Sequence, residues 1–133
     1  MARGATRTDS GVVTLQILVV DDSSHFRRIV RDLLSARGFA LFGMAPDGDR
    51  ALAALAPQCP DGALVDINLP GHDGYAVAAS ITARCPTTRV VLISADLDEV
   101  PASTLHGCGA VAFVPKTELV ATDLGRLFTP AGR

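Results

Sequence analysis

The sequence predicts an α/β protein built on a parallel sheet of five strands, with helices covering both faces. Short apolar runs alternate along the chain with segments in which apolar residues recur every three or four positions. This alternation is typical of strands joined by helical crossovers. Apolar residues make up 48% of the 133 residues and charged residues 20%, which suits a sheet buried on both faces within one domain. The expected architecture is a doubly wound sheet with right-handed crossovers.

The first strand is expected over residues 15–20, where an apolar, β-branched run ends in two aspartates. A helix should follow, because apolar residues recur at helical spacing over residues 26–34 while arginines occupy the other side. Ser23 or Ser24 can cap the start of this helix, and Gly38 can end it.

A second, poorer strand is expected over residues 39–44, followed by a turn and an alanine- and leucine-rich helix from about residue 50 to 55. Pro57 and Pro60 end that helix. The third strand, at residues 63–65, is apolar at consecutive positions, which indicates burial on both faces.

The second half of the chain repeats this pattern. Residues 75–85 carry apolar side chains at helical spacing, and residues 89–93 form the fourth strand. The helix expected within residues 97–107 should be short, because Pro101 is tolerated only in its first turn. The fifth strand spans residues 110–114.

The last helix is expected to begin at Thr117 as its N-cap. Its apolar stripe would be formed by Val120, Leu124, Leu127 and Phe128. The domain then extends over residues 15–128. Residues 1–14 are expected to form a disordered N-terminal tail that lacks the apolar segment of a signal peptide, and residues 129–133 a short C-terminal tail.

Polar residues stand where four of the five predicted strands end. Parallel strands place their carboxyl ends on one edge of the sheet, and ligands bind at that edge in folds of this class. The polar residues at these ends are Asp21 and Asp22, Asp66, Ser94, and Lys116. Three carboxylates, a hydroxyl and an ammonium group are therefore expected to share one crevice.

The three carboxylates should repel one another unless a cation lies between them. Mg²⁺ suits this set, because it takes oxygen ligands and keeps several waters. Lys116 and Ser94 can bind further phosphoryl oxygens, so the residues indicate phosphoryl transfer, with Asp66 as the acceptor in an aspartyl-phosphate. Taken alone, Asp66 can equally well cap the turn that follows it.

Several other classes of function are disfavoured. A formal net charge of -2 and the lack of a Lys/Arg run argue against direct binding of nucleic acid. No apolar stretch approaches the roughly 18 residues of a membrane span, so no membrane insertion is expected. His25, His72 and His106 share no metal-ligand spacing and are interpreted as surface or loop residues.

The three cysteines are odd in number and contain no C-x-x-C pair. Neither a disulfide framework nor a zinc site is therefore expected at Cys59, Cys85 or Cys108. The default expectation is reduced thiols in the cytoplasm.

Four segments carry a family resemblance. They are ILVVDD at residues 17–22, LVDINLP at 64–70 followed by Asp73-Gly74, VLISA at 91–95, and GAVAFVPK at 109–116. In this order they resemble the response-regulator receiver domain of bacterial two-component signalling, over nearly all of the domain. The resemblance implies a flavodoxin-like sheet with strand order 2-1-3-4-5.

The resemblance also implies roles for the acidic residues. Asp66 would be the phosphoacceptor. Asp22 and Asp66 would bind Mg²⁺ directly, Asp21 would act on the metal mainly through water, and the backbone of Asn68 would complete the ligands.

For the remaining residues the resemblance implies phosphate binding and switching. Lys116 would be the cationic partner of the phosphoryl group. Ser94 would be the hydroxyl that moves onto that group, and Phe113 the aromatic side chain that turns inward in response.

The implied partners are a sensor histidine kinase or phosphotransfer protein as donor and a downstream output protein. A phosphorylation-dependent dimer is a further expectation. The chain would not be an enzyme, beyond catalysing its own phosphorylation and dephosphorylation. It would be either a stand-alone receiver or the receiver part of a longer regulator.

Two alternatives remain open. A Mg²⁺ phosphohydrolase of the haloacid-dehalogenase type uses similar residues, but it begins with Asp-x-Asp and has its acidic pair after the lysine, whereas Asp21-Asp22 comes first here and position 68 is Asn. A pseudo-receiver would bind partners without being phosphorylated. The complete set of five residues argues against it.

Overall fold

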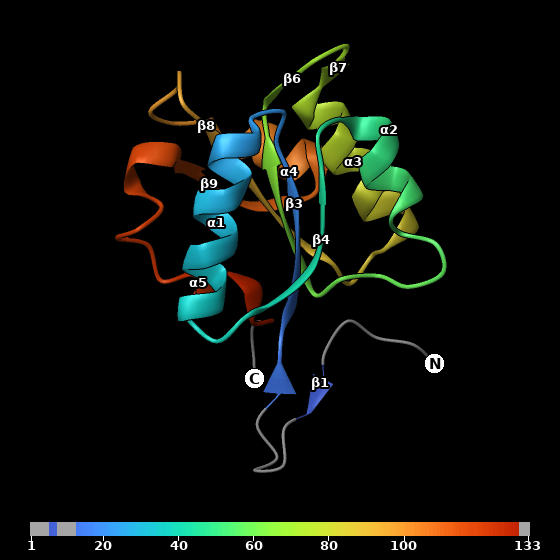
Figure 1. Cartoon of the computed structure of the whole chain (residues 1–133). Helices are drawn as coiled ribbons and strands as arrows, with labels where there is room; N and C mark the ends of the chain where they lie inside the picture. The colour runs from blue at the N-terminus through green and yellow to red at the C-terminus, as the bar shows by residue number, and fades with distance from the viewer. Residues whose placement is uncertain (1–5, 8–12, 131–133) are drawn as a thin grey trace.

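The computed structural model describes residues 6–7 and 13–130, and its centre is a five-stranded parallel sheet (Figure 1). The strands run in the order β4-β3-β5-β8-β9, which confirms the predicted order 2-1-3-4-5. The strands are β3 (Gln16–Val20), β4 (Ala40–Ala45), β5 (Gly62–Asp66), β8 (Arg89–Ser94) and β9 (Ala110–Pro115). Every residue of β5, the central strand, is buried, because helices cover both faces.

Helices lie on both faces of the sheet, as Figure 1 shows. One face carries α1 (Ser24–Ala36) and α5 (Leu124–Phe128), and the other carries α2 (Gly48–Ala53), α3 (Gly74–Arg84) and α4 (Ala102–Cys108). Two buried apolar clusters fill the spaces between sheet and helices. Alternate residues of β3 supply them, with Ile17 and Val19 in one cluster and Leu18 and Val20 in the other, as expected for successive side chains of a strand.

Side chains cap the helices near the places that the sequence indicates. The Ser23 hydroxyl accepts a hydrogen bond from the Phe26 amide at 3.1 Å at the start of α1. Gly38, just after α1, has a φ of 86°, a left-handed conformation that glycine adopts without strain. Asp47 and Asp73 cap α2 and α3 in the same way as Ser23. Helix α4 is short and begins directly after Pro101, as expected.

The end of the chain differs from the predicted last helix. A 3₁₀ turn, η1 (Lys116–Glu118), follows β9, and α5 begins only after Asp123, so Thr117 is not its N-cap. Val120 is 67% exposed and is not part of an apolar stripe. The reason is tertiary, since the Arg37 guanidinium at the end of α1 donates to the carbonyls of Val120 and Thr122 and holds this segment as a loop.

Two small hairpins add to the predicted elements. β6 (Asn68–Leu69) pairs with β7 (His72–Asp73) where a loop was expected, with Gly71 at a φ of 68° in the turn. β1 (Thr6–Arg7) pairs with β2 (Val13–Thr14), within the expected tail. The remainder of that tail, and the last residues of the C-terminal one, lie outside the described residues.

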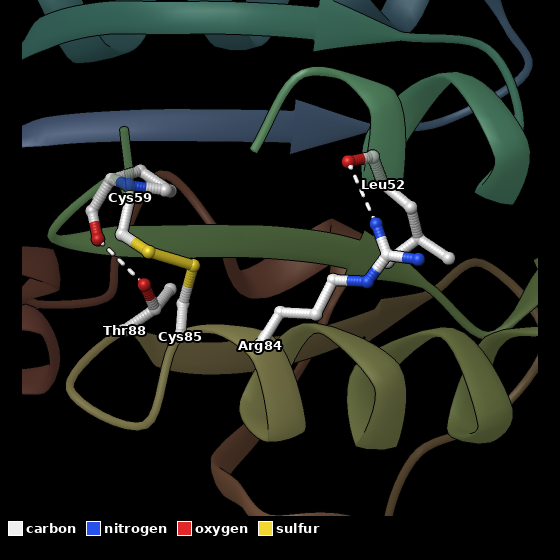
Figure 2. The surroundings of a disulfide bond; sticks show 6 residues. Leu52, Cys59, Arg84, Cys85 and Thr88 are labelled. Atoms are coloured by element: carbon white, nitrogen blue, oxygen red, sulfur yellow. Dashed lines mark hydrogen bonds between the residues drawn. A yellow bond between two sulfur atoms is a disulfide. The ribbon is translucent and has the colours of Figure 1, made fainter. Parts of the chain in front are cut away.

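A disulfide joins Cys59 and Cys85, so the prediction of reduced thiols was wrong for these two residues (Figure 2). The spacing of the cysteines does not predict this pair. The two residues meet because the fold places the segment before β5 next to the end of α3. The two Cα atoms are 5.8 Å apart, a normal separation for a disulfide. Cys108 is free and buried.

Within residues 6–7 and 13–130, no helix is both long enough and apolar enough to cross a membrane.

The packing of α5 against the sheet predicts a sharp steric requirement at Gly62. A Cβ atom there would lie 2.2 Å from the Phe128 ring, and Phe128 is itself buried. Gly62→Ala should lower the free energy of unfolding by about 1–3 kcal/mol, measured by urea denaturation. Gly43→Ala in β4 is the matched control, because its Cβ would meet only Leu18 Cδ1 at 3.8 Å. Equal stability of the two variants would contradict this packing.

Candidate functional site

Three carboxylates lie together at the carboxyl-end edge of the sheet. One oxygen from each of Asp21, Asp22 and Asp66 lies within 4.8 Å of the other two. Asp21 is fully buried and Asp66 is 5% exposed, whereas Asp22 is exposed. We call these three residues the acidic cluster. They follow or end β3 and β5, as the sequence indicates.

Two backbone groups and one side chain fix Asp21. Its amide donates to the Ala45 carbonyl at 3.0 Å, and its Oδ1 accepts from the Ser23 amide at 2.9 Å. The Arg27 guanidinium donates to the Asp21 carbonyl at 2.5 Å. The other carboxylate oxygen, Oδ2, is buried and has no well-aligned hydrogen-bond donor. It lies 2.7 Å from the Lys116 ammonium, whose positive charge balances this buried oxygen.

Asp66 ends β5, and the chain turns sharply after it. Its Oδ1 accepts from the Asn68 amide at 3.0 Å, and the loop closes through a hydrogen bond of 2.9 Å from the Gly74 amide to the Ile67 carbonyl. A Cβ atom at position 74 would lie 2.4 Å from the Asp66 carbonyl oxygen. Only glycine therefore allows α3 to start this close to Asp66.

The Lys116 ammonium lies between two members of the acidic cluster. Its Nζ is 2.7 Å from Asp21 Oδ2 and 3.2 Å from Asp66 Oδ2. It also stands 4.1 Å from the centroid of the Phe26 ring, within the range of a cation–π contact. Burial alone would lower the pKa of Lys116, but contact with the two carboxylates outweighs burial and raises its pKa. The ammonium therefore stays charged at neutral pH.

The carboxylate of Asp66 is less well stabilised. Burial raises the pKa of Asp66, and the charge of Asp21 raises it further, while the Asn68 amide and Lys116 offset these effects only in part. The ionised form is thus short of positive charge, and a further cation beside it would favour ionisation.

Ser94 and Phe113 lie on the neighbouring strands β8 and β9. Ser94 is 1% exposed, and its hydroxyl accepts from the amides of Asp96 at 3.0 Å and Leu97 at 3.3 Å. That hydroxyl thus caps the turn after β8. Phe113 is partly buried against the cluster of apolar residues on the α2, α3 and α4 face. The structure brings Asp21, Asp22, Asp66 and Lys116 together. Ser94 ends β8 with its hydroxyl bound to its own turn, and Phe113 lies within β9, opposite Leu92.

Two contacts at this edge escaped the sequence analysis. The Asn68 side chain donates to Asp96 Oδ2 at 3.1 Å, which links the turn after β5 to the turn after β8. Phe26, expected only to face the core, also supports Lys116. For the second contact, the available signal was an aromatic residue in the first helical turn after Asp21-Asp22. The first contact had no signal, because Asn68 lies in the short strand β6 and Asp96 in the turn after β8, and periodicity does not fix where these side chains point.

The three histidines are at the surface, as interpreted from the sequence, and none of them belongs to the acidic cluster. His25, His72 and His106 are exposed, and His72 Nε2 lies 3.5 Å from Asp49 Oδ1. Among the described residues, the group of carboxylate, histidine and cysteine side chains with metal-binding geometry is the acidic cluster.

Comparisons with known proteins place these observations in a family. The model of the response regulator receiver domain matches residues 17–123. The chain is 36% identical over 124 residues to protein-glutamate methylesterase/protein-glutamine glutaminase 5 of Myxococcus xanthus, which covers 91% of this chain and 35% of that protein. It is 35% identical over 100 residues to the DNA-binding transcriptional regulator NtrC of Salmonella typhimurium, covering 75% and 21%. The chain thus spans about a third or less of the length of these relatives.

Solved structures agree with this assignment. The signal receiver domain of the putative response regulator NarL from Mycobacterium tuberculosis superimposes with a TM-score of 0.70 at 33% identity, covering 90% of this chain and 98% of that one. The complex of CheX, CheY, BeF3 and Mg from Borrelia burgdorferi contains a chain with a TM-score of 0.73 at 28% identity, with 89% of each chain covered. From the matched model, the relatives and the fold together, this chain belongs to the response regulator receiver domain family.

Proposed function

We propose that Asp66 accepts a phosphoryl group and that this event changes the surface through which the domain binds a partner. The observation that carries the proposal is the position of Asp66, a nearly buried carboxylate at the end of the central strand with Lys116 Nζ at 3.2 Å and the Asn68 amide at 3.0 Å. A positive group and a backbone donor are the partners that a transferred phosphoryl group requires.

The acidic cluster fits a divalent cation, and Mg²⁺ is the proposed cofactor. The donor set consists of carboxylate oxygens, which hard cations prefer, and one oxygen from each of the three residues lies within 4.8 Å of the other two. Asp22 and Asp66 would hold the ion directly, Asp21 mainly through water, with the Asn68 carbonyl as a further ligand. When bound, the ion would neutralise charge on the incoming phosphoryl oxygens.

The groups of this chain can then direct the transfer. An Asp66 oxygen attacks phosphorus, the O–P bond forms, and the N–P bond to a phosphohistidine breaks, leaving a neutral imidazole after proton uptake. Lys116 holds one phosphoryl oxygen as a point charge. Ser94 can donate to another only after its hydroxyl leaves the turn amides that it now caps.

The donor proposed is a phosphohistidine on a sensor kinase or phosphotransfer protein, and the partner downstream is an output protein. Phosphorylation-dependent dimerisation is part of this proposal. This donor class implies action in the cytoplasm. The chemistry assigned to the chain is limited to its own phosphorylation and dephosphorylation.

The alternatives are weakened by particular observations. A haloacid-dehalogenase-type phosphohydrolase needs a second acidic residue two positions after the nucleophile, and Asn68 occupies that position with its amide turned to Asp96. A pseudo-receiver would not need to keep Lys116 poised between two carboxylates.

The first prediction concerns the acceptor. A small acyl-phosphate donor with Mg²⁺ should add one phosphoryl group to the wild type, and none to Asp66→Asn, as measured by intact mass. Asp73→Asn is the matched control, because Asp73 is exposed and caps α3. Phosphorylation of Asp66→Asn, or none of the wild type with metal present, would contradict the assignment. Turnover of phosphomonoesters would instead support a phosphohydrolase.

The second prediction concerns the metal. Mg²⁺ should bind weakly in the absence of phosphate, because the site offers few protein ligands. Asp22→Ala should abolish this binding in a calorimetric titration while the fold remains intact, since Asp22 is exposed. Asp32→Ala, an exposed aspartate on α1, should leave the titration unchanged. An unaltered Mg²⁺ affinity in Asp22→Ala would rule out this metal site.

The third prediction concerns how the signal leaves the site. Ser94→Ala should leave phosphorylation of Asp66 largely intact but uncouple it from Phe113, because the hydroxyl is the proposed link between phosphate and the turn after β8. Chemical shifts around Phe113, recorded with and without a phosphate mimic, measure the coupling. The same response in wild type and Ser94→Ala would show that the link runs elsewhere.

A further inference from the structure

The disulfide lies at the edge of the sheet opposite the acidic cluster. Cys59 stands in the segment that leads into β5, and Cys85 is the C-cap of α3 (Figure 2). Strand β5 starts just after this segment, at Gly62, and ends at Asp66. The bond therefore ties the entry to the central strand to the end of the helix that follows it.

The fold does not depend on this bond for its core. Disulfides are essential mainly in small domains that cannot bury enough apolar surface. Here both faces of the sheet carry a buried apolar cluster, and the cluster on the α1 and α5 face contains no cysteine. The bond must therefore be explained by something other than a missing core.

The segment of residues 54–61 contains Cys59 and connects α2 to β5. Backbone hydrogen bonds hold its two ends, where the Leu55 amide donates to the Leu52 carbonyl at 3.1 Å and the Asp61 amide donates to the Gln16 carbonyl at 2.9 Å. Pro57 and Pro60 have no backbone N–H, so the middle of the segment depends more on the disulfide and on the hydrogen bond of 2.7 Å from the Thr88 hydroxyl to the Pro60 carbonyl. We call residues 54–61 the tethered segment.

A second contact lies near the disulfide and joins α2 to α3. The Arg84 guanidinium donates to the Leu52 carbonyl at 3.4 Å, at the end of α2 (Figure 2). This hydrogen bond is long and exposed, so it is weak. The disulfide is the covalent link between the tethered segment and the end of α3.

The two sulfur atoms are in unequal surroundings. Cys59 is partly exposed, whereas Cys85 is 2% exposed and lies at the C-terminal end of a helix. An incoming thiolate can therefore reach the Cys59 sulfur more easily.

We propose that Cys59 and Cys85 form a reversible thiol–disulfide site, opened at Cys59 by a dithiol and closed by a low-molecular-weight disulfide, which controls the order of the tethered segment. This inference does not rest on the phosphoacceptor proposal. A disulfide with an accessible sulfur is exchanged more readily than one that is buried at both ends.

A dithiol opens the disulfide in two successive thiolate attacks. One thiolate of the dithiol attacks the Cys59 sulfur, the Cys59–Cys85 bond breaks, and Cys85 leaves as a thiolate that takes up a proton. The second thiolate of the reductant then attacks the reductant sulfur that is bonded to Cys59. This step releases Cys59 as a thiolate, which takes up a proton, and leaves the reductant as a cyclic disulfide. In closure, Cys59 attacks the small disulfide and expels one thiol, and Cys85 then attacks the Cys59 sulfur and expels the other.

Thiol trapping on the folded chain tests the exchange. Cys108→Ala removes the third cysteine and leaves the pair, so it should expose two alkylatable thiols after dithiothreitol and none after oxidised glutathione, through several cycles. With limiting reductant, the first mixed disulfide should form at Cys59. Failure of excess dithiothreitol to open the native pair, failure of the opened pair to close, or first attack at Cys85 would overturn the proposal.

Hydrogen exchange tests the structural consequence. Opening should speed amide exchange at least tenfold in the tethered segment and at Thr88 and Arg89, and leave the turns after β5 and β8 within about twofold. Cys59→Ser, at the partly exposed position, should show the same local pattern without reductant. Amide exchange that becomes faster by the same factor across the whole chain would show that the bond stabilises the fold in general and would contradict the proposal. Unchanged exchange in the tethered segment would contradict it as well.

Discussion

The requirement to neutralise two buried carboxylates shapes the edge of the sheet on which the site is built. Two like charges within 4.8 Å of each other repel by roughly 3 kcal/mol or more at an effective dielectric constant of about 20. Lys116 meets both Asp21 and Asp66, so β9 must end beside them. The strand register allows this. Asp66 on β5 pairs with Ile93, so Ser94 lies one residue beyond the level of Asp66. Ser94 pairs with Pro115, so Lys116 lies one residue beyond the level of Ser94. The lengths of the strands therefore determine which charged side chains meet at this edge.

The sheet was predictable because its signals are local and strong. Each long strand is an apolar run bounded by turn residues, and parallel strands in one sheet must share an edge for their carboxyl ends. The end of the chain was less predictable. Val120 has the spacing of a helix stripe, but the Arg37 guanidinium binds the carbonyl groups around it. A contact between elements so distant in sequence overrides a short amphipathic pattern, because helix propensity is a weak preference.

The candidate site likewise has features that could be predicted from the sequence and features that could not. Residues at strand ends could be assigned to one crevice, because topology alone places them there. Two further contacts depend on where single side chains point, which periodicity does not specify. They are the hydrogen bond from the Asn68 side chain to Asp96 and the contact between the Lys116 ammonium and the Phe26 ring. The Cys59–Cys85 pair was missed for a related reason, since cysteine spacing can reveal a recurring motif but not two isolated residues that the fold brings together.

Helix α3 links the two chemically active ends of β5. Gly74, at its start, lies against the backbone of Asp66, and Cys85, at its end, holds the tethered segment. A rigid element in contact with two sites transmits a signal only if it has two arrangements that both sites bias. The inner face of α3 is fixed in the core by Val77 and Ile81, which are 3% and 0% exposed. A helix packed in this way resists displacement, so a charge at Asp66 and a bond at Cys59 should act as separate inputs, each on its own end of the sheet.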